Sequence, residues 1–146
     1  MAEQVKARVL LVDDEEKFVE VLSRRLVSRG MAADSVLTGE DAVRQAGTIQ
    51  YDALILDLTM PGIDGMEVLH RLKGIFPELQ VIMLTGQASV SKAVVAIKEG
   101  AIDFLEKPVD IDLLVNKIIE ARDRRMLLLD RKNEEKMRDI LEKSTW

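Results

Sequence analysis

The sequence predicts an α/β fold in which a parallel sheet is covered by helices on both faces. Short apolar runs alternate along the chain with longer stretches whose apolar residues recur at helical spacing. Each run is followed by polar or turn-forming residues, which is typical of buried strands. Strands that alternate with helices favour a parallel sheet wound by right-handed crossovers. The 146 residues are enough for one domain.

The strand signal is clear in four apolar runs. They are Arg8 to Val12, Ala53 to Leu56, Gln80 to Leu84 and Ile102 to Leu105. A weaker strand is expected from Met31 to Val36, after Gly30. Glycine adopts a left-handed conformation without steric penalty, so Gly30 is suited to end the helix before this strand. The chain therefore predicts five strands.

Helical spacing fills the intervals between these runs. The pattern is clearest at Phe18, Val19, Leu22 and Leu26 in the first interval, and at Val94, Val95 and Ile97 in the fourth. The second helix is expected to begin at Thr38 or Gly39. Asp64 is expected to cap the third helix with its side-chain oxygen.

The last helix is predicted to project from the folded body. No Gly or Pro occurs between Asp110 and the final residue, Trp146, and the chain becomes strongly mixed in charge after Ala121. At ~1.5 Å per residue, a continuous helix here reaches roughly 50 Å, which exceeds a body of this size.

Composition excludes several classes of function. The net charge is −5, and no cluster of Lys and Arg occurs in the first hundred residues, which argues against direct nucleic-acid binding by the folded body. Cysteine is absent, so disulfide and thiolate chemistry are excluded. Neither a signal peptide nor a run of about 20 apolar residues is present. We expect a soluble, cytoplasmic protein that does not enter a membrane.

Chemically useful side chains follow four of the predicted strands. Asp13 and Asp14 end the first, Asp57 ends the third, Thr85 ends the fourth, and Lys107 follows the fifth. Singly, these residues are typical of solvated helix starts, caps, turns and surface charges. Because the carboxyl ends of parallel strands share one edge of the sheet, where ligands bind, the joint pattern predicts a site.

Electrostatics gives this pattern a chemistry. Unit like charges at ~4 Å repel by about 4 kcal/mol at an effective dielectric near 20, so clustered carboxylates need compensation. Mg²⁺ prefers hard oxygen ligands, and Lys107 adds a positive charge. With both present, the carboxylate of Asp57 is able to accept a phosphoryl group as an acyl phosphate. Thr85 is expected to donate its hydroxyl to the phosphoryl group and draw its loop inward, while Pro61 and Gly62 form a turn over the site.

These residues resemble the receiver domain of bacterial two-component response regulators. The matching segments are LLVDDE, LILDLTMPGIDG, MLTG and DFLEKPVD, and the resemblance covers residues 7 to 122. It implies a flavodoxin-like (βα)5 doubly wound fold with strand order 2-1-3-4-5. Residues 1–122 would form the receiver domain, and residues 123–146 a helical extension or linker.

The resemblance also implies specific roles. A histidine kinase would phosphorylate Asp57, and Asp14, Asp57 and the backbone carbonyl of Thr59 would hold Mg²⁺. Asp13 would act on the metal through water or as a nearby anion. The bond between Lys107 and Pro108 would be cis.

The fifth strand departs from the commoner family pattern. Receivers often carry Tyr or Phe there as a rotamer switch coupled to the threonine, and this chain has Phe104. Phenylalanine lacks a hydroxyl, so a hydrogen bond cannot report the active state. Inward movement of Phe104 with Thr85 and a static core position both remain open.

Three other functions deserve comparison. Aspartyl-phosphate phosphatases also use a strand-terminal Asp and Mg²⁺, but they place a second acid where this chain has Thr59, so an enzyme acting on external substrates is disfavoured. An enzyme that hydrolyses nucleotides is disfavoured further, because the chain has no G-x-x-x-x-G-K-[ST] phosphate loop. A receiver-like interaction module that is never phosphorylated is disfavoured because the pocket acids and Lys107 are all retained.

The C-terminal segment raises the question of dimerisation. Its apolar seam is interrupted by Asn133 and otherwise consists of Met126, Leu129, Met137 and Ile140. The seam does not keep strict heptad register, so both a homodimer and a solvated linker remain open. The segment resembles the linker after receivers of enhancer-binding, NtrC-type transcription regulators. His70, the single histidine, is expected to be an exposed polar residue rather than a relay site.

Overall fold

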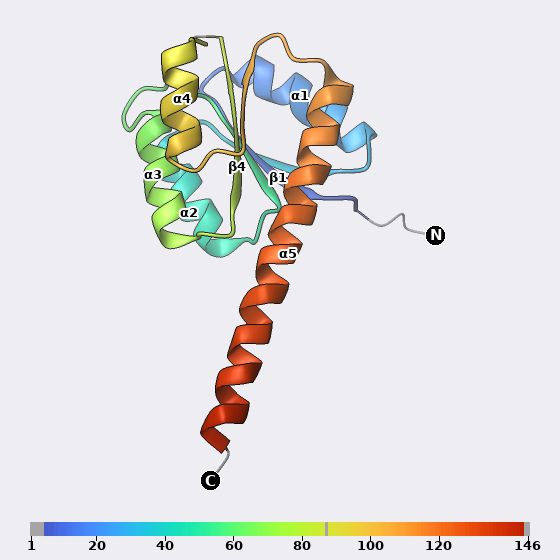
Figure 1. The fold of residues 1–146 in the computed structure, drawn as a ribbon. Coiled ribbons are helices and arrows are strands. Elements are labelled where there is room, and N and C mark those ends of the chain that lie inside the picture. Colours follow the sequence, from blue (N-terminus) through green and yellow to red (C-terminus); the bar gives the residue numbers. More distant parts are fainter. Residues whose placement is uncertain (1–4, 87, 145–146) are drawn as a thin grey trace.

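The computed structural model describes residues 5–86 and 88–144, which form five strands and five helices in strict alternation (Figure 1). The strands are β1 (Arg8–Val12), β2 (Ala32–Val36), β3 (Ala53–Leu56), β4 (Gln80–Thr85) and β5 (Asp103–Glu106). The helices are α1 (Glu16–Ser28), α2 (Gly39–Thr48), α3 (Gly65–Ile75), α4 (Val90–Lys98) and α5 (Ile111–Ser144).

All neighbouring strands pair in parallel, in the order β2-β1-β3-β4-β5. The predicted fold class and strand order are therefore confirmed. The order reverses direction at β1 and β3, which lie side by side at the centre of the sheet. In open α/β sheets, this reversal creates a crevice outside the carboxyl ends of the strands.

Successive residues of each central strand face opposite sides of the sheet, and both sides are apolar. Leu10 and Leu54 belong to the core shared with α2, α3 and α4. Leu11 and Ile55 belong to the core shared with α1 and α5. Each fully buried side chain of this size contributes about 1.5–3 kcal/mol to folding. Helices thus cover both faces of the sheet (Figure 1), and an apolar core lies beneath each layer of helices.

The ends of several elements follow local sequence signals. The side chains of Thr38, Asp64 and Ser89 each accept a hydrogen bond from the backbone N–H three residues later, at the starts of α2, α3 and α4. The predicted cap at Asp64 and the predicted start of the second helix at Thr38 or Gly39 are thus confirmed. Gly30 has φ of 91°, as expected for a glycine that ends a helix.

Three strands differ from the predicted ones by one residue at one or both ends. β2 begins at Ala32 instead of Met31. β4 extends to Thr85, and β5 spans Asp103–Glu106 instead of Ile102 to Leu105. For β4 and β5, the reason lies in the pairing of the two strands. Thr85 is paired with Glu106, and the Thr85 carbonyl accepts the N–H of Lys107 at 2.9 Å, which extends the ladder.

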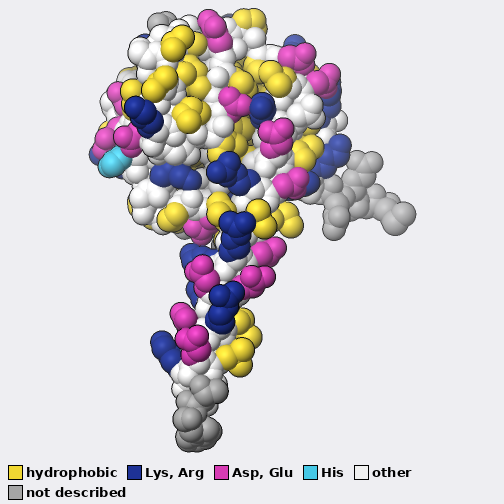
Figure 2. Space-filling model, in the orientation of Figure 1, with side chains coloured by type: hydrophobic (Ala, Val, Ile, Leu, Met, Phe, Trp, Pro, Cys, Tyr) yellow, Lys and Arg dark blue, Asp and Glu magenta, His cyan; other side chains and the backbone are white. Residues whose placement is uncertain are grey.

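Helix α5 has two contrasting parts, as predicted. Leu114, Ile118 and Ala121 are fully buried against the sheet, whereas every residue from Asp130 to Ser144 is exposed. This second part projects from the body (Figure 1), and acidic and basic side chains intermingle along it (Figure 2). None of the described helices is long and apolar enough to cross a membrane.

Candidate functional site

An acidic cluster, defined here as Asp13, Asp14 and Asp57, lies at the carboxyl edge of the sheet. One carboxylate oxygen from each residue lies within 4.8 Å of the others. Asp13 and Asp57 are buried, while Asp14 is exposed. The residues meet because β1 and β3 are adjacent, and the N–H of Asp57 donates to the carbonyl of Val12 at 2.9 Å.

Lys107 enters this cluster from the loop that follows β5. Its Nζ donates to Oδ2 of Asp13 at 2.6 Å and to Oε1 of Glu15 at 3.0 Å. Its distance to Oδ2 of Asp57 is 3.9 Å. Among the described residues, the ammonium of Lys107 thus contacts three acids, and the exposed Asp14 of the same cluster adds a fourth negative charge, so these acids outnumber the cation that they share.

The pKa values of Asp13 and Lys107 reflect both their burial and their charged neighbours. Burial raises the pKa of Asp13, and the nearby charge of Asp57 raises it further, although hydrogen bonds from Lys107 and the Glu15 N–H act in the opposite direction. Burial alone would lower the pKa of Lys107, but its hydrogen bonds to Asp13 and Glu15 outweigh this effect and raise it. The pKa of each group therefore lies above its ordinary value.

The cluster fits a magnesium ion by its chemistry. Its donors are carboxylate oxygens, which hard divalent cations prefer, and their separation suits shared coordination. The excess negative charge gives a cation a direct electrostatic advantage at this point. Asp14 is exposed, so the site is open to water and to an arriving phosphate group on this side.

The loop between β3 and α3 packs closely around Asp57. The N–H of Thr59 lies 3.5 Å from Oδ1 of Asp57, and the N–H of Gly65 donates to the carbonyl of Leu58 at 2.8 Å. A Cβ on Gly65 would lie 2.2 Å from the carbonyl oxygen of Asp57, so only glycine fits there. Gly62 has φ of 81°, consistent with the predicted turn. The metal-binding role of the Thr59 carbonyl stays a prediction.

Thr85 and Phe104 occupy different parts of the last two strands. Thr85 is fully buried at the end of β4, which pairs with β3, the strand that Asp57 follows. Phe104 pairs with Met83 and packs, partly buried, against the core of α2, α3 and α4. The two residues are thus two pairs apart on neighbouring strands, and their predicted coupling stays a prediction. The bond between Lys107 and Pro108 is cis, as expected.

Two contacts of Lys107 were missed by sequence reasoning. Glu15 accepts one of its hydrogen bonds, and its Nζ lies 4.2 Å from the centroid of the Phe18 ring. Glu15 belongs to the acidic run DDEE that begins at Asp13, so the sequence did mark it as one of the acids near the end of the first strand. Phe18 carried only the signal of a helical core residue, since nothing local indicates that its ring faces a cation.

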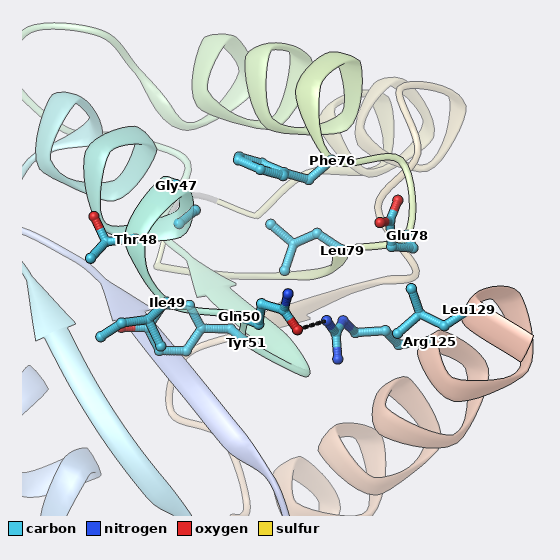
Figure 3. Close-up of a pocket in the computed structure, with 11 residues that line it drawn as sticks. Gly47, Thr48, Ile49, Gln50, Tyr51, Phe76, Glu78, Leu79, Arg125 and Leu129 are labelled. Carbon is cyan, nitrogen blue, oxygen red and sulfur yellow. Dashed lines mark hydrogen bonds between the residues drawn. The ribbon is translucent and has the colours of Figure 1, made fainter. Parts of the chain in front are cut away.

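Other candidate features lie away from the acidic cluster. His70 is exposed, as predicted, and its Nδ1 lies 3.2 Å from Oε2 of Glu99. A separate pocket occurs beside the loops that precede β3 and β4, where α5 leaves the body (Figure 3). There the guanidinium of Arg125 points to the side-chain oxygen of Gln50, at 3.4 Å, and Leu129 closes the rim.

Several known proteins are similar to this chain in sequence, in fold or in both. The family model for the response regulator receiver domain matches residues 9–119. The transcriptional regulatory protein TcrA of Mycobacterium tuberculosis is 38% identical over 111 residues, which are 76% of this chain and 44% of that protein. The C4-dicarboxylate transport transcriptional regulatory protein DctD of Pseudomonas aeruginosa is 39% identical over 129 residues, 86% of this chain and 27% of that protein.

A solved structure extends the comparison to three dimensions. The solution structure of the beryllofluoride-activated NtrC4 receiver domain dimer matches with a TM-score of 0.76 and 36% identity, covering 81% of this chain and 98% of that one. The chain spans less than half the length of the two curated relatives named above.

Proposed function

This chain belongs to the response regulator receiver domain family of two-component systems, and we propose that it is a switch operated by phosphorylation of Asp57. The observation that carries the proposal is the position of Lys107, whose ammonium hydrogen bonds to Asp13 and lies 3.9 Å from Asp57. A carboxylate acceptor, a cation beside it and further acids for a metal are the groups that phosphoryl transfer to aspartate requires.

Transfer begins with an oxygen of Asp57 attacking the phosphorus of a phosphohistidine on a histidine kinase. The phosphorus–nitrogen bond breaks, its electrons return to the imidazole, and an acyl phosphate forms on Asp57. Asp14, Asp57 and the Thr59 carbonyl would hold Mg²⁺, with Asp13 nearby, and the ion would neutralise charge on the phosphoryl oxygens. Hydrolysis later returns Asp57 to its free form, so the chain acts on no external substrate.

The signal follows from new contacts of the phosphoryl group. Lys107 forms an ion pair with it, and the Thr85 hydroxyl donates a hydrogen bond to it. Because the Thr85 carbonyl already accepts the Lys107 N–H, the ends of β4 and β5 move together. Phe104, two pairs along the same ladder, then repacks against the core beside α4.

Mass spectrometry tests this function. Incubation with acetyl phosphate and Mg²⁺ should add one phosphoryl group, and hydroxylamine should remove it. Asp57→Asn should abolish the gain, whereas Asp41→Asn, an exposed aspartate in the first turn of α2, should leave it unchanged. Absence of the gain in the wild type, while a control receiver is labelled, would contradict the switch and favour an interaction module that is not phosphorylated.

We further propose that residues 1–122 act as the receiver and that residues 123–146 carry the signal to an output domain or partner. The described part of this extension exposes Met137, Ile140 and Leu141 by more than half of their surface. Such apolar side chains on an otherwise charged helix suit a homodimer with a second α5.

Light scattering on the full chain separates a dimer from a solvated linker. The wild type should be a dimer, and the double substitution of Met137→Glu with Ile140→Glu should give a monomer. Glu134→Gln, on the same exposed helix, is the control and should remain a dimer. A monomeric wild type at all concentrations would contradict dimerisation through α5.

A further inference from the structure

The ammonium of Lys107 has two neighbours that the switch mechanism leaves without a role. Glu15 accepts a hydrogen bond from Nζ at 3.0 Å, and the centroid of the Phe18 ring lies 4.2 Å from the same atom. Both residues belong to the segment that begins with Asp13, the third partner of Lys107. One short stretch after β1 therefore sets the position of the ammonium group.

The acids around Lys107 differ sharply in burial. The side chains of Asp13 and Asp57 are 6% and 7% exposed, and that of Lys107 is 12% exposed. The side chain of Glu15 is 63% exposed. Water readily replaces an ion-pair partner on an exposed carboxylate, whereas a buried carboxylate that loses its partner is left as an uncompensated charge. Glu15 is thus the partner that Lys107 can leave at little cost.

Phe18 provides an attraction that does not depend on which oxygen Lys107 contacts. A cation over an aromatic face is held by the ring's quadrupole and keeps this attraction while its hydrogen bonds change. The ring is itself fixed, because Phe18 lies near the start of α1 and packs against the core shared with α5. It is placed to support the ammonium group before and after it moves.

We propose that Phe18 and Glu15 are positioning residues for Lys107. Glu15 holds the Lys107 ammonium in the resting state. After phosphorylation of Asp57, the ammonium moves across the face of the Phe18 ring toward the phosphoryl group. This inference rests on the proposed function. The phosphoryl group brings a charge of about −2 beside Asp57, which exceeds the single charge of Glu15 and draws Lys107 away from it. Asp13 remains bonded throughout.

Initial rates of labelling by acetyl phosphate with Mg²⁺ test this arrangement. Phe18→Leu keeps an apolar side chain but loses the ring, and it should slow labelling about fivefold, whereas Phe18→Tyr keeps the ring and should restore most of the rate. Glu15→Gln releases Lys107 and should speed labelling about threefold. Glu16→Gln removes the same charge one residue later, in the first turn of α1, and should change the rate less.

Nuclear magnetic resonance gives a readout that needs no phosphorylation. The side-chain protons of Lys107 near Nζ should be shifted upfield by the ring current of Phe18, and Phe18→Leu should abolish the shift while Phe18→Tyr keeps it. Adding the phosphoryl group should retain the shift. Thermal unfolding of each variant identifies a rate change that merely reflects a loosened fold.

The outcomes separate this inference from the proposed function. A wild type that takes no phosphoryl group overturns both. A labelled wild type whose Phe18→Leu and Phe18→Tyr variants slow equally overturns the role of the ring. Glu15→Gln that slows labelling overturns the resting role of Glu15, because it would show that Glu15 assists the productive position of Lys107.

Discussion

Both edges of the sheet carry partly or fully buried charges, but the two edges differ in how these charges are balanced. At the amino edge, Asp52 accepts the Arg8 N–H at 2.8 Å and pairs with Arg125 at 3.4 Å. At the carboxyl edge, the acidic cluster and Glu15 share the single ammonium of Lys107. The balanced edge fastens α5 to the body, whereas the unbalanced edge has spare negative charge for a cation and a phosphoryl group.

This difference distinguishes charge that stabilises the fold from charge that serves the site. Removing one partner of a largely buried, hydrogen-bonded ion pair destabilises the fold, because the other charge is left unpaired. Crowded like charges give the opposite result, since removing one of them relieves repulsion. The same substitution should therefore have opposite effects at the two edges.

Helix α3 runs between these edges, and its two glycines give the largest expected contrast. Gly65→Ala would place a Cβ 2.2 Å from the Asp57 carbonyl oxygen and 2.7 Å from Leu58 Cα, both backbone atoms. We expect a loss of about 3 kcal/mol in the free energy of unfolding, because the loop at the acceptor must open. Urea denaturation measures this loss.

Gly74→Ala is the matched control in the same helix. A Cβ there meets nothing within 4 Å, and alanine favours helix, so this variant should gain about 0.5–1 kcal/mol. Equal effects of the two substitutions would show that the loop around Asp57 is not tightly packed.

The aspartates of the two edges give the next contrast. Asp52→Asn should lose about 1 kcal/mol, because it removes the charge that pairs with Arg125. Asp13→Asn should gain about 1 kcal/mol near neutral pH, because it removes a buried negative charge and the repulsion of that charge by Asp57. Urea denaturation of both variants without Mg²⁺ measures the two signs. Destabilisation by Asp13→Asn under these conditions would contradict the charge imbalance.

The pH dependence of this gain follows from the raised pKa of Asp13. A group whose pKa is raised by folding adds stability below its unfolded pKa, and this stability is lost as the pH rises through the folded pKa. Asp13→Asn removes that loss. Its advantage should therefore be present near pH 7 and disappear below about pH 4.

Tyr51 gives the smallest expected effect, because its hydroxyl stays neutral at pH 7 and ionises only at high pH. This tyrosine of the amino edge is buried and donates its hydroxyl to Oδ2 of Asp34 at 2.7 Å. Burial and that carboxylate raise the pKa of Tyr51 to about 12. Because it is the single tyrosine, absorbance of the phenolate reports it directly. Titration near pH 10 in the folded protein would contradict the burial of this side chain and its bond to Asp34.

Much of the carboxyl edge was predictable because strand direction alone determines it. Apolar runs located the strands, and the residues that follow them, such as Asp57 and Lys107, had to gather at one edge. Asp64 and Gly30 carried signals that depend only on local backbone conformation, and both were confirmed.

What escaped prediction depends on side-chain direction and close approach. The contact of Lys107 with Phe18 joins residues far apart in the chain, and helical spacing marks Phe18 only as apolar. The need for glycine at position 65 arises from the Asp57 backbone passing beneath α3, which no local pattern indicates. The one-residue shift of β5 reflects its pairing with β4.

Dependence of labelling on Mg²⁺ tests the central claim most directly, because it reads the acceptor and the unbalanced charge together. Peptide mass spectrometry after exposure to acetyl phosphate should locate one phosphoryl group on Asp57 when Mg²⁺ is present and almost none when it is chelated. The yield should rise to saturation with Mg²⁺ concentration. Labelling that is independent of Mg²⁺, or that persists in Asp57→Asn, would contradict the account.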